Sequence, residues 1–500
     1  MEVEAGAAAG AAASVGGGSA TKRKLAAVDA PAGLVVQFGH GVFMRGHIDW
    51  MLQQSRDAGL WAGNVVGVKL TSRGDIGPLG AQPAYPLAVR GAQGGARVDE
   101  SSEVGVVERW LNPHDGKGGG LAALLATATQ PHVAMVVSNS TEAGIAYTQA
   151  PSPFDRRGNA KSCPETFPAK LTMWLATRFG AGLGGAGGGA GGKLTVLPLE
   201  LVENAAAKLR AIVLRHANDW RLGDKAGTAF EAWLTQHVEF RSTLVDRIVT
   251  KPDDADDPRL VVVEPYHLLV VEEPPTAASG GEMEKQLQLK AAGLNVVYSR
   301  DLAKWRTRKV RLLNGAHHTL VFLGLRLGLS NVKECMAHAL LGPLVRHVLE
   351  REVAPALDGT DLAPRSAAEQ AEVDTYVSTV LERFSNPFLD HKLASIALNS
   401  AAKVRVRLMP AIGDYQARKQ AERGASGAGR GPLPPGLVLA LAAFFAYDGP
   451  ALAGCDAEPA RTEVCAEVDG LAEALERATA ALRSDTEAAI RAVADGATWI

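Results

Sequence analysis

The chain has 500 residues, which is more than one ordinary hydrophobic core holds, so we expect two or three domains. It carries 52 Lys and Arg residues against 54 Asp and Glu residues, and its pI is about 6.7. This balance lacks the basic excess of a nucleic-acid-binding protein or of a protein that lies on a membrane surface, and it argues against both classes. The longest apolar run, at 436–447, is shorter than the roughly 20 residues that span a bilayer, so it indicates a buried helix.

The cysteines and the first residues bear on the cellular setting. Four cysteines lie far apart, without Cys-x-x-Cys spacing or neighbouring histidines, which argues against a structural zinc site and against a disulfide framework. This pattern favours a reducing, cytoplasmic setting. Residues 1–30 are rich in Ala and Gly, include Glu2 and Glu4, and lack the apolar core of a secretory signal. We interpret them as a disordered tail whose composition leaves organellar targeting open.

Short β-branched runs alternate with helix-sized gaps in the first half of the chain. They lie at 33–39, 63–70, 132–140, 193–201 and 259–273. This alternation predicts an α/β fold in which a Rossmann-type, doubly wound parallel sheet occupies 31–273. The Pro- and Gly-rich segment 272–282 marks a boundary, and the apolar residues beyond it recur at helical spacing, as in 332–357 and 471–494. We therefore predict a mostly α-helical second domain over 280–500.

A glycine-containing turn follows the first predicted strand, in "QFGHGVFMRG". Gly39 and Gly41 there would let the backbone approach a pyrophosphate at a helix N-terminus. Met44 replaces the third glycine of the dinucleotide fingerprint, so a merely tight strand-to-helix turn is the alternative interpretation. No acidic residue directly follows the second predicted strand, which leaves NAD or NADP open. The candidate cofactor contacts in this turn are Phe38, Gly39, Gly41, Phe43 and Arg45.

The basic stretch "RTRKVRLLNGAHH" at 306–318 contains a possible catalytic group. Asn314 and His317 are neighbours at i, i+3 on a helix, and the long side chain of Lys309 could reach the same side. Three arginines, Arg306, Arg308 and Arg311, would lower the pKa of that lysine toward the range useful for proton transfer. Such a constellation suits hydride transfer without a metal. The alternatives are a solvated arginine face with a core histidine, or a nucleic-acid-binding patch.

Six stretches together resemble one known family, in the same order along the chain. They are "VVQFGHGVFMRGHIDWM", "VVSNSTEAGIAY", "FPAKLTMWL", "STLVDRIV", "RKVRLLNGAHH" and "RFSNPFLDHKLASIALNSAAK". The chain is similar to the polyol-specific long-chain dehydrogenase/reductase family, which includes the mannitol dehydrogenases. The resemblance implies a zinc-independent oxidoreductase with no metal site. It also implies a Rossmann domain, a helical domain, and an active site in the cleft between them.

The resemblance also assigns roles to residues. It implies that Lys309 is the general acid/base, that Asn314 polarises the substrate carbonyl, and that His317 completes the catalytic signature. The Val-Asp-Arg-Ile motif places Asp246 in the same active-site network, although a buried structural Asp–Arg pair is the alternative. Lys403 matches a lysine on the substrate side. Residues near the nicotinamide ribose would be Asn139, Thr141 and Glu142, with simple turn formation as the alternative.

Two departures from the mannitol dehydrogenases indicate the substrate. The position of their second carbonyl-binding asparagine is Leu201 here, with Glu200 and Asn204 alongside, and an arginine of theirs is replaced by Ser395. Both differences favour the branch of the family that reduces keto-uronates. Cations that could bind the uronate carboxylate are Lys403, Arg407 and His391.

We therefore expect NAD(P)-dependent reduction of a keto-uronate such as tagaturonate to an aldonate such as altronate, with no nucleic-acid or membrane partner. A polyol dehydrogenase acting on mannitol and fructose, or a fructuronate reductase, is the alternative within enzymes. A catalytically silent cofactor-binding protein is the alternative outside them. The oligomeric state is left open.

Overall fold

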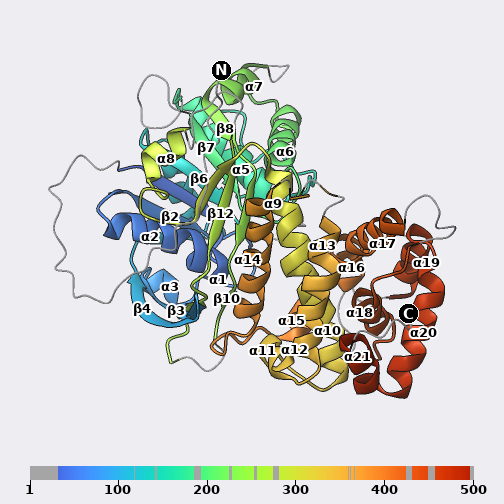
Figure 1. Cartoon of the computed structure of the whole chain (residues 1–500). Coiled ribbons are helices and arrows are strands. Elements are labelled where there is room, and N and C mark those ends of the chain that lie inside the picture. Colours follow the sequence, from blue (N-terminus) through green and yellow to red (C-terminus); the bar gives the residue numbers. More distant parts are fainter. Residues whose placement is uncertain are drawn as a thin grey trace, which may run out of the picture.

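We analysed a computed structural model of the chain (Figure 1). It describes residues 32–495 except 117–118, 141–143, 185–192, 224–227, 253–255, 274–280, 358–359, 361, 365, 424–430 and 449–456. The predicted tail at 1–30 therefore lies outside the described residues.

A six-stranded parallel sheet with the order β5-β2-β1-β6-β7-β8 organises the first half of the chain. Its strands are β1 (Leu34–Phe38), β2 (Asn64–Val68), β5 (Val107–Leu111), β6 (Val133–Ser138), β7 (Leu194–Pro198) and β8 (Val238–Phe240). Strands β2 and β5 lie on one side of β1, and β6, β7 and β8 lie on its other side, so the strand order reverses between β1 and β6. In a doubly wound sheet such a switch point opens a crevice at the carboxyl ends of the strands.

Both faces of this sheet are covered, as the uninterrupted apolar runs of its strands require. Val35 belongs to a core cluster on one face, while Val36 and Phe38 belong to a cluster on the other. The first face is covered by α1 (Val42–Met44), the π-helix η1 (Arg45–Asp49), α2 (Trp50–Asp57), α3 (Pro78–Ala81) and α8 (Gly281–Leu287). The second is covered by α4 (Gly119–Ala128), α5 (Phe167–Gly180), α6 (Ala205–Asp219) and α7 (Thr228–His237). The predicted Rossmann-type fold class is confirmed.

Two smaller sheets lie beside the main one. One has the order β10-β11-β3-β4 and the other β13-β12-β9. Their strands are β3 (Tyr85–Gln93), β4 (Ala96–Val104), β9 (Thr243–Asp246), β10 (Val249–Thr250), β11 (Val261–Val263), β12 (Leu268–Glu272) and β13 (Val296–Ser299). The prediction of a single strand over 259–273 is wrong, because this segment forms two strands, β11 and β12, which belong to different sheets. Pro265, which has no N–H for a ladder, lies in the break.

Beyond β13 the described residues form helices and connecting segments only, as predicted. The helices are α9 (Leu302–Arg308), the π-helix η4 (Lys309–Asn314), α10 (Gly315–Arg326), α11 (Val332–Ala337), α12 (Leu341–His347), the π-helix η5 (Val348–Val353), α13 (Ala354–Ala356), α14 (Ala367–Phe384), α15 (Leu393–Ala397), α16 (Ser400–Arg407), α17 (Met409–Arg423), α18 (Pro435–Phe445), α19 (Ala457–Glu467), α20 (Leu471–Ser484) and α21 (Thr486–Ala494).

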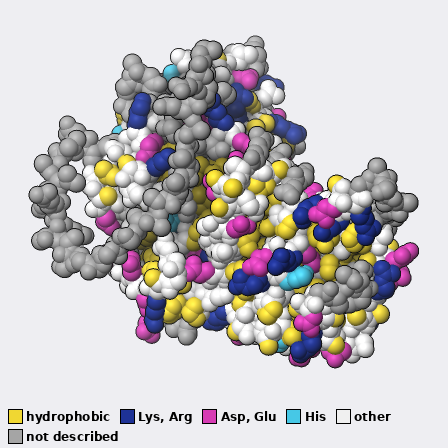
Figure 2. All heavy atoms as spheres, viewed as in Figure 1, with side chains coloured by type: hydrophobic (Ala, Val, Ile, Leu, Met, Phe, Trp, Pro, Cys, Tyr) yellow, Lys and Arg dark blue, Asp and Glu magenta, His cyan; other side chains and the backbone are white. Residues whose placement is uncertain are grey.

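The predicted buried helix is α18, whose residues from Gly436 to Phe444 are all buried in the core of the helical half. Within the described residues we find no helix whose length and apolar character would let it cross a bilayer. The face drawn in Figure 2 mixes Lys and Arg side chains with Asp and Glu side chains over the helical half. This mixing matches the net charge of -2 and gives no broad basic surface there.

Candidate active site

The first candidate site is a cavity at the switch point of the main sheet. Gly39, directly after β1, has φ +130, and a Cβ on it would lie 3.1 Å from the carbonyl oxygen of Asn139, so the turn requires glycine. The helix that begins at Val42 points its N-terminus into the same region. The cavity measures about 480 Å³, and Gly39, Gly41, Thr71 and Asn139 are among its lining residues. A close backbone approach beside a helix N-terminus fits a dinucleotide phosphate.

Three of the other predicted cofactor contacts, Phe38, Phe43 and Arg45, are not among the lining residues of this cavity. Phe38 is fully buried, with its ring centroid 5.5 Å from that of Phe167. Arg45 is buried and donates to the carbonyl oxygens of His40 (3.3 Å) and Arg259 (2.7 Å), so it ties the turn to a distant loop. Phe43 lines the second cavity described below. Thr141 and Glu142 lie outside the described residues.

The residue directly after β2 is the buried Lys69, in the region where NAD-binding folds place an acidic residue that binds the ribose. Lys69 donates to the carbonyl oxygens of Thr71 and Arg73, so its charge is held by the loop that borders the cavity. Leu70 and Thr71 line the cavity after β2, and the acidic residue among the lining residues, Glu165, comes from the segment before α5.

The second candidate site is a cavity of about 300 Å³ where the strand-rich and helical halves meet. The helical half contributes Lys309, Asn314, His317, His391, Ile396, Lys403, Arg407 and Leu313, and the strand-rich half contributes Phe43, Asp246, Arg247, Ile248 and Val249. Eight predicted site residues from widely separated stretches thus line one cavity. They are Lys309, Asn314, His317, His391, Lys403, Arg407, Asp246 and Phe43.

A π-helical turn explains how Lys309 and Asn314 come to share the cavity. The backbone from Leu302 to Arg326 is helical throughout, but Lys309–Asn314 forms the wider i→i+5 turn of a π-helix. Residues five apart therefore lie above one another, which places Lys309 and Asn314 on one face. His317 follows Asn314 at i, i+3 in α10. Such bulges are frequent at functional sites.

Lys309 is partly buried, and its ammonium, which lies between charges of both signs, donates to the carbonyl oxygen of Val245 at 2.5 Å. Burial lowers the pKa of Lys309; Asp246 acts in the opposite direction, and the positive charges of Arg383 and Arg407 lower the pKa further. A lysine in this environment reaches its neutral form at a lower pH than an exposed one.

The predicted role of the three neighbouring arginines is wrong. Arg308 lies over the rings of Trp305 (4.3 Å) and Tyr376 (4.5 Å), and Arg311 pairs with Asp414 at 2.9 Å. The largest charge effects on the pKa of Lys309 come from Asp246, Arg383 and Arg407, which lie in other segments of the chain. The side chains of Arg308 and Arg311 leave the helix in directions that the linear sequence does not reveal.

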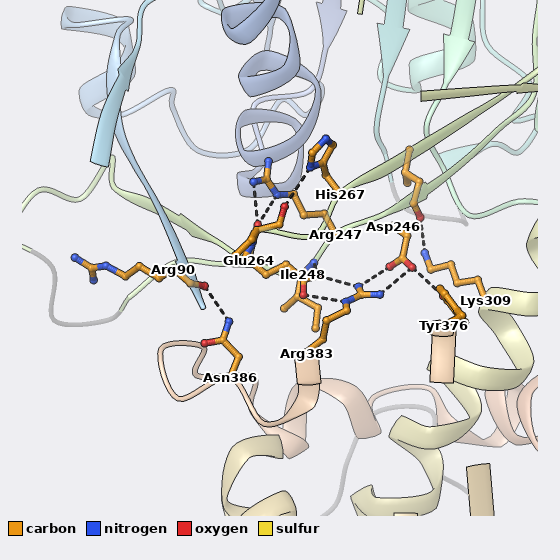
Figure 3. Close-up of polar contacts among 12 residues, drawn as sticks. Arg90, Asp246, Arg247, Ile248, Glu264, His267, Lys309, Tyr376, Arg383 and Asn386 are labelled. Atoms are coloured by element: carbon orange, nitrogen blue, oxygen red, sulfur yellow. Dashed lines mark hydrogen bonds and ion pairs between the residues drawn. The ribbon is translucent and has the colours of Figure 1, made fainter. Parts of the chain in front are cut away.

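A buried ionic network lies directly behind Lys309 (Figure 3). The guanidinium of Arg383, on α14, donates to both oxygens of Asp246 (2.8 and 3.1 Å) and to both oxygens of Glu264 (2.8 and 2.9 Å). The hydroxyl of Tyr376 donates to Asp246 at 3.1 Å. Asp246, Glu264 and Arg383 are each no more than 5% exposed. The network therefore joins the strand-rich half to the helical half.

This network keeps Asp246 ionised beside the lysine. Burial alone raises the pKa of Asp246, but the positive charges of Arg383 and Lys309 outweigh it and bring that pKa to about 2. For Glu264 burial prevails over Arg383, so its pKa is raised. Glu264 also accepts from the backbone N–H of Ile248 at 2.5 Å, which fixes the Val-Asp-Arg-Ile segment. The alternative interpretation, a buried structural Asp–Arg pair, matches the pairing of Asp246 with Arg383, whereas the adjacent Arg247 donates to the carbonyl oxygens of Gly46 and Glu264.

Asn314 and His317 present unpaired polar atoms in the cavity wall. Among the described residues, Oδ1 of Asn314 and Nε2 of His317 are buried and have no hydrogen-bond partner. The ring of His317 lies between those of Phe384 and His391, with centroids 4.2 and 4.9 Å away. Burial lowers the pKa of His317 well below its usual range, so its ring is neutral. Buried polar atoms without partners are costly unless a ligand satisfies them.

The predicted substrate-side residues divide into two groups. Lys403 and Arg407 share a face of α16 at i, i+4 as predicted, and both line the cavity together with His391. Glu200 and Asn204 do not line it. The carboxylate of Glu200 is buried and accepts from Ser138 and Ser140. Asn204 precedes α6 in a left-handed conformation and lines a different cavity.

Comparisons with known proteins agree with this arrangement. The family model for the mannitol dehydrogenase Rossmann domain matches residues 34–285, and the model for the mannitol dehydrogenase C-terminal domain matches residues 301–454. The chain belongs to the mannitol dehydrogenase family. The family predicted from the six stretches is thereby confirmed, as is the class of nicotinamide-dependent oxidoreductases.

Within this family the chain has relatives that cover most of its length. It is 36% identical over 440 residues to the altronate oxidoreductase of Halalkalibacterium halodurans, an overlap of 84% of this chain and 77% of that protein. It is 32% identical over 433 residues to the altronate oxidoreductase of Bacillus subtilis, with 84% and 80% covered.

Two solved structures share the fold of this family member. Mannitol 2-dehydrogenase from Pseudomonas fluorescens, in ternary complex with NAD and D-mannitol, is 20% identical with a TM-score of 0.64, over 94% of this chain and 95% of that one. A substrate-free D-sorbitol dehydrogenase is 21% identical with a TM-score of 0.62, over 93% and 92%.

Three members of the buried network, Arg383, Glu264 and Tyr376, were absent from the residues predicted for the site. Arg383 is the first residue of the stretch "RFSNPFLDHKLASIALNSAAK", and Glu264 ends the apolar run "VVVEP". An acid that ends a fully apolar strand is a usable signal, because a buried carboxylate requires a partner. Among the described residues, no group of three or more His, Cys, Asp or Glu side chains could hold a metal ion. This finding does not test the prediction that the enzyme needs no metal.

Proposed function

We propose that the chain is an NAD-dependent altronate oxidoreductase, which reduces the keto-uronate tagaturonate to the aldonate altronate and catalyses the reverse reaction. The observation that carries this proposal is the cavity in which Lys309, Asn314 and His317 meet the cationic side chains of Lys403 and Arg407. A partly buried lysine with a lowered pKa beside unpaired polar atoms suits proton transfer to a carbonyl oxygen, and the cations suit an acidic substrate. The curated relatives named altronate oxidoreductase support the same assignment.

We propose the following roles for the residues of the cavity. Lys309 gives a proton to the substrate oxygen as the carbonyl becomes a hydroxyl group, and takes it back in the oxidation. Asn314 and His317 hold that oxygen in line with the lysine. Asp246 holds the lysine by its charge, and Arg383 and Glu264 hold Asp246. The glycine turn at Gly39 would hold the phosphates of the nicotinamide cofactor, which when bound would supply the hydride.

We propose NAD as the cofactor, and the structure of the mannitol 2-dehydrogenase complex with NAD supports this choice. NADP stays the alternative, because the loop after β2 offers Lys69 and Thr71 where NAD-specific folds place an acid. We also propose two domains, a Rossmann domain that includes 31–273 and a helical domain. Because α8 and β13 pack on the strand-rich half, the helical domain begins after β13 and not at 280 as predicted. The free thiols of Cys163, Cys335 and Cys465 support a cytoplasmic setting.

The proposal is tested by steady-state kinetics of the purified protein. Tagaturonate, fructuronate and fructose are assayed with NADH and with NADPH, and altronate and mannitol are assayed in the oxidative direction. We expect the highest kcat/KM for tagaturonate with NADH. A preference for fructose and mannitol would establish a polyol dehydrogenase, and a preference for fructuronate would establish a fructuronate reductase. NADH binding without turnover of any substrate would establish a catalytically silent protein.

A further inference from the structure

Three cationic candidates surround the cavity, and they differ in how they are held. His391 is not a cation at neutral pH, because burial, followed by the charge of Arg383, lowers its pKa to about 4. The ammonium of Lys403 donates to the carbonyl oxygens of Ile396 (3.1 Å) and Leu398 (2.5 Å), at the end of α15. Two of its three donors therefore hold the backbone that leads into its own helix.

Arg407 is held by a side chain that lies behind the cavity. Its Nη1 lies 3.3 Å from Nδ1 of His318, and Nε2 of His318 lies 3.2 Å from the hydroxyl oxygen of Ser400. The hydroxyl of Ser400 donates to the carbonyl oxygen of Ala397 at 2.7 Å, so Ser400 must accept from His318. The imidazole therefore carries its proton on Nε2, and Nδ1 accepts from Arg407.

The surroundings of His318 keep this direction of hydrogen bonding. His318 is 1% exposed, and burial, followed by the charges of Arg407 and Lys403, lowers its pKa well below the usual range, although a hydrogen bond to the backbone of Asn314 acts in the opposite direction. A neutral ring retains one acceptor nitrogen, whereas a protonated ring would repel the guanidinium. The backbone is equally constrained, because a Cβ on Gly315 would lie 3.2 Å from the carbonyl oxygen of Arg407. Gly315 thus permits the close packing of α10 against the end of α16.

We infer that Arg407 binds the carboxylate of the substrate, and that the chain Ser400–His318 positions its guanidinium for that contact. This inference rests on the proposed function and assigns the acidic specificity of the same cavity to one residue. A guanidinium presents parallel donors that match the two oxygens of a carboxylate, and an ammonium that already serves two carbonyl groups does not. His318 is a positioning residue, since it touches Arg407 from behind and is not among the residues that line the cavity.

The test compares tagaturonate with tagatose, which carries a hydroxymethyl group in place of the carboxylate. We expect Arg407→Met to lower the ratio of kcat/KM for tagaturonate to kcat/KM for tagatose by about tenfold or more, mainly through KM for tagaturonate, whereas the loss of its effect on Lys309 acts on both substrates alike. The matched control is Arg405→Met on the same helix. Arg405 pairs with Glu463 and Glu467 at the surface, so we expect no change in the ratio of the two substrates.

Variants of His318 separate positioning from packing. His318→Leu should lose preference for tagaturonate in the same direction as Arg407→Met. His318→Asn should restore most of it, because the amide oxygen can accept where Nδ1 does. Thermal melting of each variant verifies that it folds, and a merely structural role would lower the rates for both substrates alike.

The outcomes distinguish this inference from the proposed function. Wild-type protein that prefers tagaturonate, with an unchanged substrate ratio in Arg407→Met, would overturn the inference and leave the function standing. A ratio that collapses in Lys403→Met and persists in Arg407→Met would do the same and would assign the carboxylate to Lys403. Wild-type protein that favours tagatose would overturn both.

Discussion

Replacing Arg383 by methionine removes the one guanidinium that pairs with both Asp246 and Glu264. The two carboxylates are 2% and 1% exposed, so each would lose its compensating charge in a site that water barely reaches. Removing one partner of a buried ion pair costs about 3–5 kcal/mol of unfolding free energy, because the remaining charge stays buried. We expect Arg383→Met to lose at least that amount, and Arg383→Lys to lose less, since it keeps the charge but not the fork.

The pH dependence of this loss follows from the direction of the pKa shifts. In the wild type the pKa of Asp246 is depressed to about 2, so its pairing stabilises the fold above the unfolded value of about 4 and is lost as the pH falls through the folded value. Without Arg383, burial raises the pKa of Asp246, and the folded variant relieves the cost by taking up a proton. The difference in stability between wild type and Arg383→Met should therefore be largest near pH 8 and smaller near pH 5.

Thermal unfolding at both pH values measures this difference. At about 2 °C per kcal/mol, the expected shift in midpoint is roughly 6–10 °C at pH 8. The matched control is Arg346→Met, which breaks an exposed pair with Glu350 and should cost less than about 1 kcal/mol. A shift for Arg383→Met as small as that of Arg346→Met, or one that grows as the pH falls, would refute the reasoning.

Three further predictions concern the reaction and the cofactor turn. Lys309→Met should lower kcat by about 10²–10⁴-fold and leave the NADH dissociation constant, measured by fluorescence titration, unchanged. The control Lys304→Met, at an exposed neighbouring lysine, should change neither value, and equal losses of kcat in the two variants would exclude Lys309 as the acid. The rate of reduction should fall as the pH rises through the lowered pKa of Lys309. Asp246→Asn should move this decline in rate to lower pH, because the carboxylate raises the pKa of the lysine, and a decline that stays at the same pH would contradict this. Gly39→Ala should weaken NADH binding and lower the melting temperature, because Gly39 has φ +130 and a Cβ there would contact a carbonyl oxygen. The control Gly105→Ala has open space around it and should do neither, and similar behaviour of the two variants would show that the turn tolerates a side chain.

The sequence predicts those parts of the fold whose pattern is local. The runs at 33–39 and 132–140 became β1 and β6, because β-branched residues without polar alternation are typical of a strand covered on both faces. The division of 259–273 was missed, since hydrophobicity continues across Pro265 and only the pairing partners differ. The hairpin of β3 and β4 was also missed, because β4 is largely exposed and lacks an apolar pattern.

The candidate site was predictable to the extent that resemblance reached it. Lys309, Asn314 and His317 line one cavity, as the helical spacing and the long lysine side chain predicted. The π-helical turn at Lys309–Asn314 was not predicted, because the spacing argument assumes 3.6 residues per turn. The tuning charges were attributed to sequence neighbours of Lys309. They come instead from residues such as Arg383, which is distant in sequence and adjacent only after folding.

This origin of the charges links catalysis to the assembly of the two halves. Asp246 is supplied by β9 of the strand-rich half, while Lys309 and Arg383 are supplied by helices of the other half. When the halves separate, Asp246 loses Arg383 and Lys309 loses both its carboxylate partner and its burial. The lysine would then return toward the behaviour of an exposed amine, and the acid needed at neutral pH would be poorly matched to the carbonyl. The lowered pKa of Lys309 is therefore a property of the closed interface, so any change that loosens Arg383 should alter the pH profile of turnover before it abolishes the fold.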